Sequence, residues 1–183
     1  MNMPPALGPM PSDRLVTTLD ERLVRAPLPV IFALAADVER WPRHLTHYRF
    51  VRMVERTADG GGLVEMSASR PFGPLDWPTW WTSWMSVAHP ASGSAPSIRF
   101  RHVRGVTAGM DVEWSFHERR EGTLARIVHV WNGPPVPVIG AMAARMVIAP
   151  VFVHGIASRT LAGLAAVAEG TKPGATGNEV GRG

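Results

Sequence analysis

The 183-residue chain has no cysteine and only one lysine, Lys172. The absence of cysteine excludes disulfides, thiolate metal sites and a cysteine nucleophile. Positive charge comes almost wholly from arginine, and the net charge is only +4 although the pI is near 10.9. The arginines are scattered, with no run of five and no basic helix face. We therefore expect no nucleic-acid partner.

Signals for export or for a membrane span are weak. The N-terminus, MNMPPALGPMPSD, has no basic segment followed by an apolar run. A long apolar stretch at residues 136–157 is interrupted by Arg145, Pro150 and His154. A charge near the bilayer centre costs roughly 2.5–3.5 kcal/mol, and proline removes a helical hydrogen bond. We expect this stretch to be a buried or cavity-lining helix, and the protein to be cytoplasmic.

Length and composition fit one domain, since 45% of the residues are apolar and 19% are charged. Four prolines among residues 1–12 predict a flexible N-terminal arm. The glycine-rich residues 170–183 predict a disordered tail. The predicted domain therefore spans residues 13–169.

Periodicity and turn residues predict one strand, two short helices, six strands and one long helix. Pro27 and Pro29 suit the first turn of a helix, and Pro42 is expected to end or kink it, leaving a second short helix around residues 44–48. The predicted strands are 14–24, 50–56, 63–70, 77–87, 97–104, 110–118 and 124–131. A helix then runs from the Gly133-Pro134-Pro135 break to about residue 169. This order indicates an α+β fold with a curved antiparallel sheet of about seven strands around the C-terminal helix.

Two stretches resemble the START-like superfamily of polyketide cyclases, dehydrases and lipid-transport proteins. The first is VRAPLPVIFALAADVERWPRHLTHY, with Asp37 followed by Trp41-Pro42, and the second runs from Met110 to Trp131. The resemblance covers roughly residues 14–168 and implies the helix-grip (Bet v 1-like) fold. It also implies an internal cavity for polyketides, quinones, sterols, phospholipids or plant hormones. No metal or nucleotide cofactor is implied for the binding itself.

The resemblance also points to individual pocket positions. Tyr48, Met110 and Trp114 match positions that line the family pocket. Bacterial aromatase/cyclases carry an arginine on the fourth strand, where this chain has Met85. That departure weakens the specific resemblance to aromatases.

Strand alternation predicts independently which side chains face the cavity. One row contains Met110, Val112, Trp114 and Phe116, and a second contains Ile127, His129 and Trp131. On the tryptophan-rich strand, Trp81 and Met85 are predicted to face inward and Trp80 and Trp84 outward. The outward pair would form an exposed patch. A partner subunit in a homodimer, transient contact with a membrane, or the N-terminal arm are the candidates for covering it.

Three residues are the candidates for catalysis. His129 is a potential acid or base, or a pocket histidine satisfied by one hydrogen bond. Tyr48, the only tyrosine, is placed to donate to a ligand carbonyl or to anchor its helix. Arg70 is placed to pair with a ligand carboxylate or enolate, or to form a surface salt bridge.

The predicted ligand-binding side chains are mostly large and apolar, although core packing would use the same residue types. They are Trp81, Met85, Met110, Trp114, Phe116, Trp131, Met142, Met146 and His154. The remaining histidines show no metal-ligand spacing, so we expect no metal site. We find no Gly-rich phosphate loop or nucleophile elbow, and we expect no cofactor.

Three functions are compatible with these features. The first is a carrier or binding protein for a polyketide, quinone or lipid-like molecule. The second is a cyclase, aromatase or dehydrase that acts on a bound poly-ketone by non-covalent acid/base catalysis. The third is a membrane-adjacent protein that extracts a lipid. A carrier needs an almost wholly apolar lining, whereas an enzyme needs converging titratable groups with shifted pKa values.

Overall fold

A computed structural model describes residues 7–72, 75–90, 95–105, 107–133 and 154–170. Seven antiparallel strands form one sheet in the order β1-β7-β6-β5-β4-β3-β2. The strands are β1 (Val16–Val24), β2 (Tyr48–Arg56), β3 (Gly62–Phe72), β4 (Leu75–Ala88), β5 (Ser97–Gly105), β6 (Asp111–Arg119) and β7 (Gly122–Trp131). The predicted α+β class and seven-stranded antiparallel sheet are confirmed.

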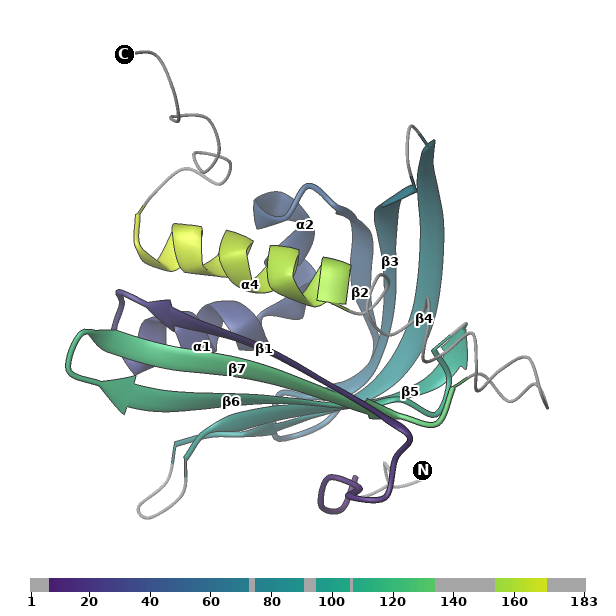
Figure 1. Cartoon of the computed structure of the whole chain (residues 1–183), viewed down its shortest axis with the longest axis horizontal. Coiled ribbons are helices and arrows are strands. Elements are labelled where there is room, and N and C mark those ends of the chain that lie inside the picture. The colour runs from purple at the N-terminus through teal and green to yellow at the C-terminus, as the bar shows by residue number, and fades with distance from the viewer. Residues whose placement is uncertain (1–6, 73–74, 91–94, 106, 134–153, 171–183) are drawn as a thin grey trace.

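The helices lie on the concave side of the curved sheet (Figure 1). They are α1 (Leu28–Ala36), the 3-10 turn η1 (Val38–Arg40), α2 (Trp41–His44) and α4 (His154–Ala168). Pro27 caps α1 and a further proline sits in its first turn, where no backbone N–H is needed. Helix α4 comes very close to α2, because a Cβ on Gly163 would lie 2.2 Å from Leu45 Cδ2. Glycine at this position permits that approach.

The boundaries of the second short helix differ from the prediction. Pro42 lies in the first turn of α2 and so begins a helix instead of ending one. The helix ends at His44, and Tyr48 is the first residue of β2. The segment predicted as a loop at residues 71–76 is also shorter, since β3 extends to Phe72 and β4 begins at Leu75.

The hairpin between β2 and β3 is tied to β4 by one carboxylate. Asp59 accepts hydrogen bonds from Gly61 N at 3.1 Å and from Val87 N at 2.9 Å. Its second oxygen also accepts from the Ser86 hydroxyl. Gly60 adopts a φ of 86°, which glycine tolerates best. The turn between the predicted strands 50–56 and 63–70 therefore has a defined role in holding three strands together.

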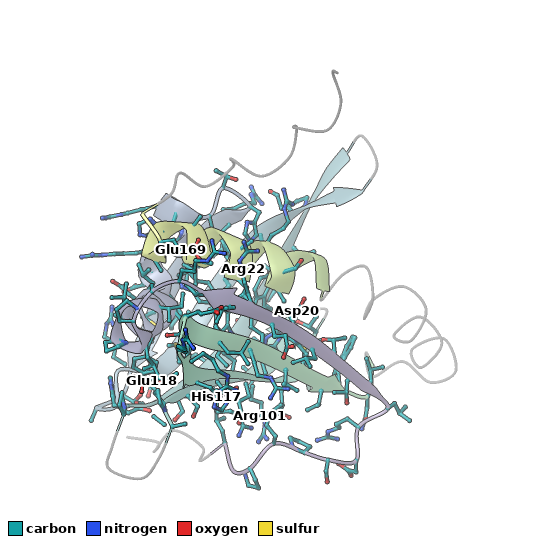
Figure 2. All side chains as sticks on the ribbon, turned by 60° about the vertical axis from the view of Figure 1, so that its left-hand side comes forward. Asp20, Arg22, Arg101, His117, Glu118 and Glu169 are labelled. Atoms are coloured by element: carbon teal, nitrogen blue, oxygen red, sulfur yellow. The ribbon has the colours of Figure 1, made fainter. Side chains whose placement is uncertain are left out.

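Arg101 lies on the outer face of the sheet, the side away from α4 (Figure 2). It forms a cluster of charged residues with Asp111, Arg99 and Glu113. Asp111 is almost fully buried, with its carboxylate 2.8 Å from the Arg101 guanidinium and 3.8 Å from that of Arg99. The two arginines also donate to backbone carbonyls of the N-terminal arm, at Leu7 and Gly8. Leu7 is buried, so this part of the predicted arm packs on the sheet.

Replacing Asp111 with alanine is expected to destabilise the fold, because two guanidinium groups would lose their buried counter-charge. We expect a loss of about 2–3 kcal/mol in the free energy of unfolding, somewhat reduced because solvent reaches Arg101. Urea denaturation measures this loss. Glu113→Ala is the matched control, since its carboxylate lies 3.6 Å from Arg99 and is 34% exposed. Its loss should stay below about 1 kcal/mol, and equal losses for both variants would contradict the argument.

Candidate functional site

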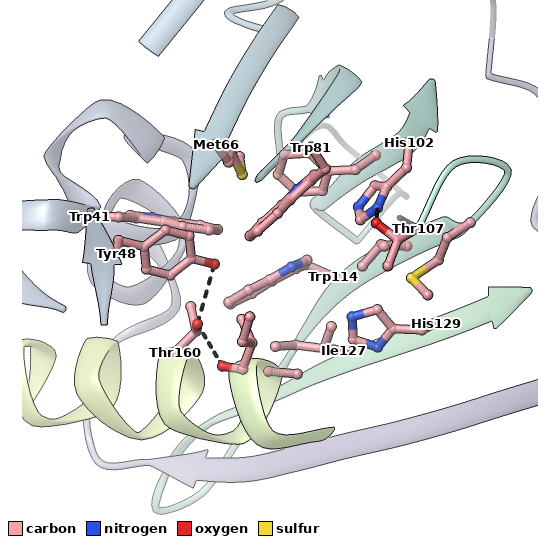
Figure 3. Close-up of a pocket in the computed structure, with 15 residues that line it drawn as sticks. Trp41, Tyr48, Met66, Trp81, His102, Thr107, Trp114, Ile127, His129 and Thr160 are labelled. Carbon is pink, nitrogen blue, oxygen red and sulfur yellow. Dashed lines mark hydrogen bonds between the residues drawn. The ribbon is translucent and has the colours of Figure 1, made fainter. Parts of the chain in front are cut away.

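A cavity lies between the inner face of the sheet and the first turns of α4 (Figure 3). The volume of the cavity is about 70 Å³. The lining residues are Trp41, Tyr48, Met66, Trp81, Phe100, His102, Thr107, Met110, Val112, Trp114, Ile127, His129, Ile156, Ala157 and Thr160. Aromatic and aliphatic side chains therefore form most of the wall, with polar groups in a minority.

Three tryptophans from separate elements form the aromatic part of the wall. Trp41 lies on α2, Trp81 on β4 and Trp114 on β6. The Trp41 ring lies 5.7 Å from the Trp114 ring and 5.2 Å from the Tyr48 ring, measured between centroids. The Trp41 indole is fixed by a hydrogen bond from Nε1 to the carbonyl of Leu34. These contacts hold the Trp41 ring in its place in the wall.

One end of the cavity carries a buried hydroxyl network (Figure 3). Thr160 Oγ1 on α4 lies 3.0 Å from His47 Nε2 and 3.4 Å from the Tyr48 hydroxyl. The Thr160 hydroxyl donates its hydrogen to the carbonyl of Ile156, at 2.8 Å. Its oxygen can then accept from His47 and from Tyr48. Tyr48 is therefore oriented by α4, with its phenol at the cavity wall.

The opposite end carries two histidines, each with a threonine partner (Figure 3). His102 Nδ1 on β5 lies 2.7 Å from Thr107 Oγ1. His129 Nδ1 on β7 lies 3.2 Å from Thr18 Oγ1 on β1. The His102 ring also stacks on Trp81, with 5.9 Å between centroids and 22° between planes. Both imidazoles are therefore fixed by a hydrogen bond or by packing.

The histidines of the site are held in their neutral forms. Burial lowers the pKa of His129 from 6.5 to about 3. Burial, and to a smaller extent the nearby His129, lowers the pKa of His102 to about 3. Burial and the positive charge of Arg159 lower the pKa of His47 to about 4. Part of the surface of the His102 and His129 rings faces the cavity, but protein surrounds both rings and disfavours their charged forms.

Five of the predicted site residues lie in the cavity wall. Tyr48 and His129 were predicted as catalytic candidates, and Trp81, Met110 and Trp114 as ligand-binding residues. The alternation argument placed the rows of β6 and β7 correctly, since Val112 and Ile127 line the wall as well. Position in the wall is a geometric result, and the roles of these residues stay predictions.

Three predicted ligand-binding residues face inward but lie outside the lining of this cavity, and their role in binding stays a prediction. Phe116 packs edge-on against Phe32 of α1, with 5.5 Å between centroids, so α1 fills that end of the sheet. Trp131 donates from its indole Nε1 to the carbonyl of Ala108 and closes the loop before β6. Met85 is 3% exposed in the core. Facing inward is therefore necessary for lining the cavity but is not sufficient.

The other predicted site residues cannot be placed by their side chains. Arg70 lies near the end of β3, where its backbone pairs with Trp77, and its side chain is outside the described part of the structure. His154 is the first residue of α4, and its side chain is likewise outside that part. Met142 and Met146 lie in residues 134–153, outside the described residues.

Sequence reasoning did not single out five polar or aromatic residues of the wall, which are Trp41, Phe100, His102, Thr107 and Thr160. His102 follows Ile98 and Phe100 in strict alternation on β5, a signal that would have placed it inward. Trp41 was noted only as part of the Trp-Pro pair. No sequence pattern marks Thr107, which lies in the loop after β5, or Thr160, which meets His47 only through tertiary contact.

The described part of the chain has neither a cluster of metal ligands nor a helix that could span a membrane. No three histidine, aspartate or glutamate side chains gather as metal ligands would. None of the helices described is both long enough and apolar enough to cross a bilayer.

The two outward-facing tryptophans of β4 differ in exposure. Trp80 is 49% exposed, and Val54, Phe50 and Val103 add to the apolar surface of the sheet. Trp84 is half-buried. Its cross-strand neighbour Arg101 binds the carbonyl of Leu7, which brings the N-terminal arm close to it.

Comparison with known proteins places this geometry in a family. Residues 24–156 match the family described as polyketide cyclase / dehydrase and lipid transport. A putative polyketide cyclase of Streptomyces halstedii is 29% identical over 110 residues, which cover 60% of this chain and 94% of that protein.

Solved structures share the fold at low identity. An aromatase/cyclase from Streptomyces sp. R1128 superposes with a TM-score of 0.65 at 15% identity, covering 84% of this chain and 93% of the other. A START superfamily protein from Mycobacterium smegmatis gives a TM-score of 0.57 at 18% identity, covering 84% and 94%. The family match spans well over half of the sequence and agrees with the sheet, the helices and the cavity. The chain belongs to the polyketide cyclase/dehydrase and lipid transport family.

Proposed function

We propose that the chain binds a flat hydrophobic molecule of polyketide, quinone or lipid type in the cavity, as a carrier or binding protein. The observation that carries this proposal is the group of three tryptophans in the wall of a cavity that has polar groups at both ends. Aromatic faces favour planar apolar ligands, and a few fixed polar groups set their orientation. The family to which the chain belongs is described as one of polyketide cyclases, dehydrases and lipid transport.

Unfilled space supports a binding role over simple core packing. Protein interiors contain few voids larger than a water molecule, because empty space forfeits van der Waals contact. Here Trp41, Trp81 and Trp114 surround a space that their own side chains do not fill. Each indole is buried in the fold, with 8% or less of its surface exposed. A ligand would replace the contacts that the empty cavity lacks.

Cyclisation or dehydration of a bound poly-ketone is the second candidate function. The presence of both His102 and His129 in the cavity wall favours it, because an enzyme of this type needs polar groups among the carbonyls of its substrate. With pKa values near 3, these imidazoles are weak bases. They suit polarisation of a bound carbonyl better than removal of a proton. Tyr48 and Arg70 remain further candidates, as the sequence analysis proposed.

Contact with a membrane or with a second copy of the chain stays a prediction for the outer face. It rests on the exposure of Trp80.

Native mass spectrometry of the purified protein, followed by solvent extraction, tests the binding proposal directly. We expect a co-purifying polyketide, quinone or lipid at close to one molecule per chain. A protein that is empty and also binds none of a panel of apolar dyes would contradict the proposal.

Trp81→Leu is expected to weaken the binding of an apolar dye such as 8-anilinonaphthalene-1-sulfonate about tenfold, or roughly 1.4 kcal/mol, because apolar contact area is lost. Trp80→Leu is the matched control, since the two tryptophans are neighbours on β4 and only Trp81 lines the cavity. Fluorescence titration measures both affinities. Equal losses in the two variants would place the dye outside the cavity.

Deuterium exchange distinguishes the cyclase from the carrier. A cyclase that polarises carbonyls should accelerate exchange of the central CH₂ of 2,4-pentanedione in D₂O, followed by proton NMR. His129→Gln should then reduce the acceleration about tenfold or more, in line with the usual contribution of a positioned polar group. An exchange rate no faster than with a denatured sample would leave the carrier function alone.

The neutral histidines predict a pH dependence of stability. The unfolded chain takes up protons near pH 6.5, whereas in the folded chain the pKa values of His102 and His129 are about 3 and that of His47 is about 4. Stability is therefore full above pH 6.5 and falls as the pH drops toward the folded pKa values. Urea denaturation at about pH 7.5 and 4.5 measures the difference. His129→Gln should reduce it, and the exposed His89→Gln should not.

A further inference from the structure

The histidine end of the cavity shows a regular pattern of hydrogen bonds. His102 and His129 each engage a threonine hydroxyl through Nδ1, at 2.7 Å and 3.2 Å. Thr18 lies behind the His129 ring on β1 and does not line the cavity. Among the described residues no hydrogen bond joins the two rings, and none reaches Nε2 of either. The Nε2 edges are therefore left for whatever occupies the cavity.

The direction of these hydrogen bonds follows from the threonines. A hydroxyl carries one hydrogen, which needs an acceptor when it is buried, and leaving it without one costs about 1–3 kcal/mol. Thr107 is 5% exposed, and His102 Nδ1 is the acceptor that the described residues offer to its hydroxyl. Thr18 is half-buried on the inward row beside His129, and His129 Nδ1 is the acceptor that the described residues offer to its hydroxyl. Each threonine therefore donates to Nδ1.

An Nδ1 atom that accepts a hydrogen bond carries no hydrogen. In a neutral imidazole the hydrogen then resides on Nε2, which becomes a donor. Burial lowers the pKa of both rings and supports the neutral form. The stacking of His102 on Trp81 fixes the plane in which its Nε2–H points.

We propose that His102 and His129 form a two-donor subsite that holds a carbonyl or enolate oxygen of the ligand through their Nε2–H groups. The subsite deepens the proposed function and rests on it for the identity of the ligand. It selects molecules with an oxygen acceptor at one end over hydrocarbons of the same shape. Thr18 and Thr107 are positioning residues, since they act through the rings.

The tautomer can be measured without a ligand. Long-range ¹H–¹⁵N correlation spectra of the full chain labelled with ¹⁵N-histidine distinguish a protonated from an unprotonated ring nitrogen, and His102→Asn and His129→Asn assign the signals. We expect the Nε2–H pattern for both rings at about pH 7. An Nδ1–H pattern, or averaged shifts in either ring, would overturn the proposal.

The threonines supply matched variants. Thr107→Val removes the hydroxyl while keeping its shape, and Thr107→Ser keeps the hydroxyl. We expect Thr107→Val to move the His102 shifts toward averaging while the His129 shifts stay unchanged, and Thr107→Ser to preserve the native pattern. A structural role for Thr107 without tautomer control would leave the His102 pattern unchanged in Thr107→Val.

Ligand selectivity is tested with two probes of one shape, 1-indanone and indane, titrated against the same NMR signals. We expect 1-indanone to bind about tenfold more tightly than indane, because its carbonyl gains about one net hydrogen bond to the buried donors. We also expect 1-indanone to shift both Nε2–H signals. Equal affinities would overturn the proposal. Failure of both probes to bind would count against the proposed function, and the tautomer spectra would then decide the inference alone.

Discussion

The register of the sheet determines what the cavity contains. One cross-strand row runs Met85, Phe100, Val112, His129 and Thr18 across β4, β5, β6, β7 and β1. Side chains directly opposite one another share a face, so the row faces inward along its whole length. A slip of one residue between β7 and β1 would turn either His129 or Thr18 to the outer face of the sheet. The hydrogen bond between His129 and Thr18 is therefore a product of the register.

Burial of polar groups imposes the second constraint. A buried imidazole costs free energy unless it is neutral and hydrogen-bonded. The structure meets this requirement for His47, His102 and His129 with Thr160, Thr107 and Thr18. Each threonine lies in a different element from its histidine. The partner of His47, which precedes β2, is on α4. The partner of His102 on β5 is in the loop before β6, and the partner of His129 on β7 is on β1. The same bonds that satisfy the rings thus join separate parts of the fold at the cavity wall.

The sequence was sufficient for the architecture and for part of the wall, for physical reasons. Period-two alternation placed Met110, Trp114 and His129 inward because both strands are regular and pair without interruption. Alternation did not distinguish residues of the cavity wall from residues of the core, since Phe116 and Trp131 also face inward. Phe116 packs against α1, and Trp131 donates to the carbonyl of Ala108. Contacts that link distant segments leave no local pattern.

The two ends of the cavity differ in what they offer a ligand. At one end Thr160 is engaged by Ile156, His47 and Tyr48, and the oxygen of the Tyr48 hydroxyl can accept a further hydrogen bond. At the other, the proposed Nε2–H groups of His102 and His129 only donate. An oxygen-bearing ring system would satisfy both ends while its faces contact Trp114 and its neighbours. Because groups with pKa values near 3 do not take up a proton at neutral pH, chemistry at this end would proceed by stabilising charge on the ligand oxygen. Binding and any catalysis would then use the same two hydrogen bonds, strengthened as negative charge develops on that oxygen.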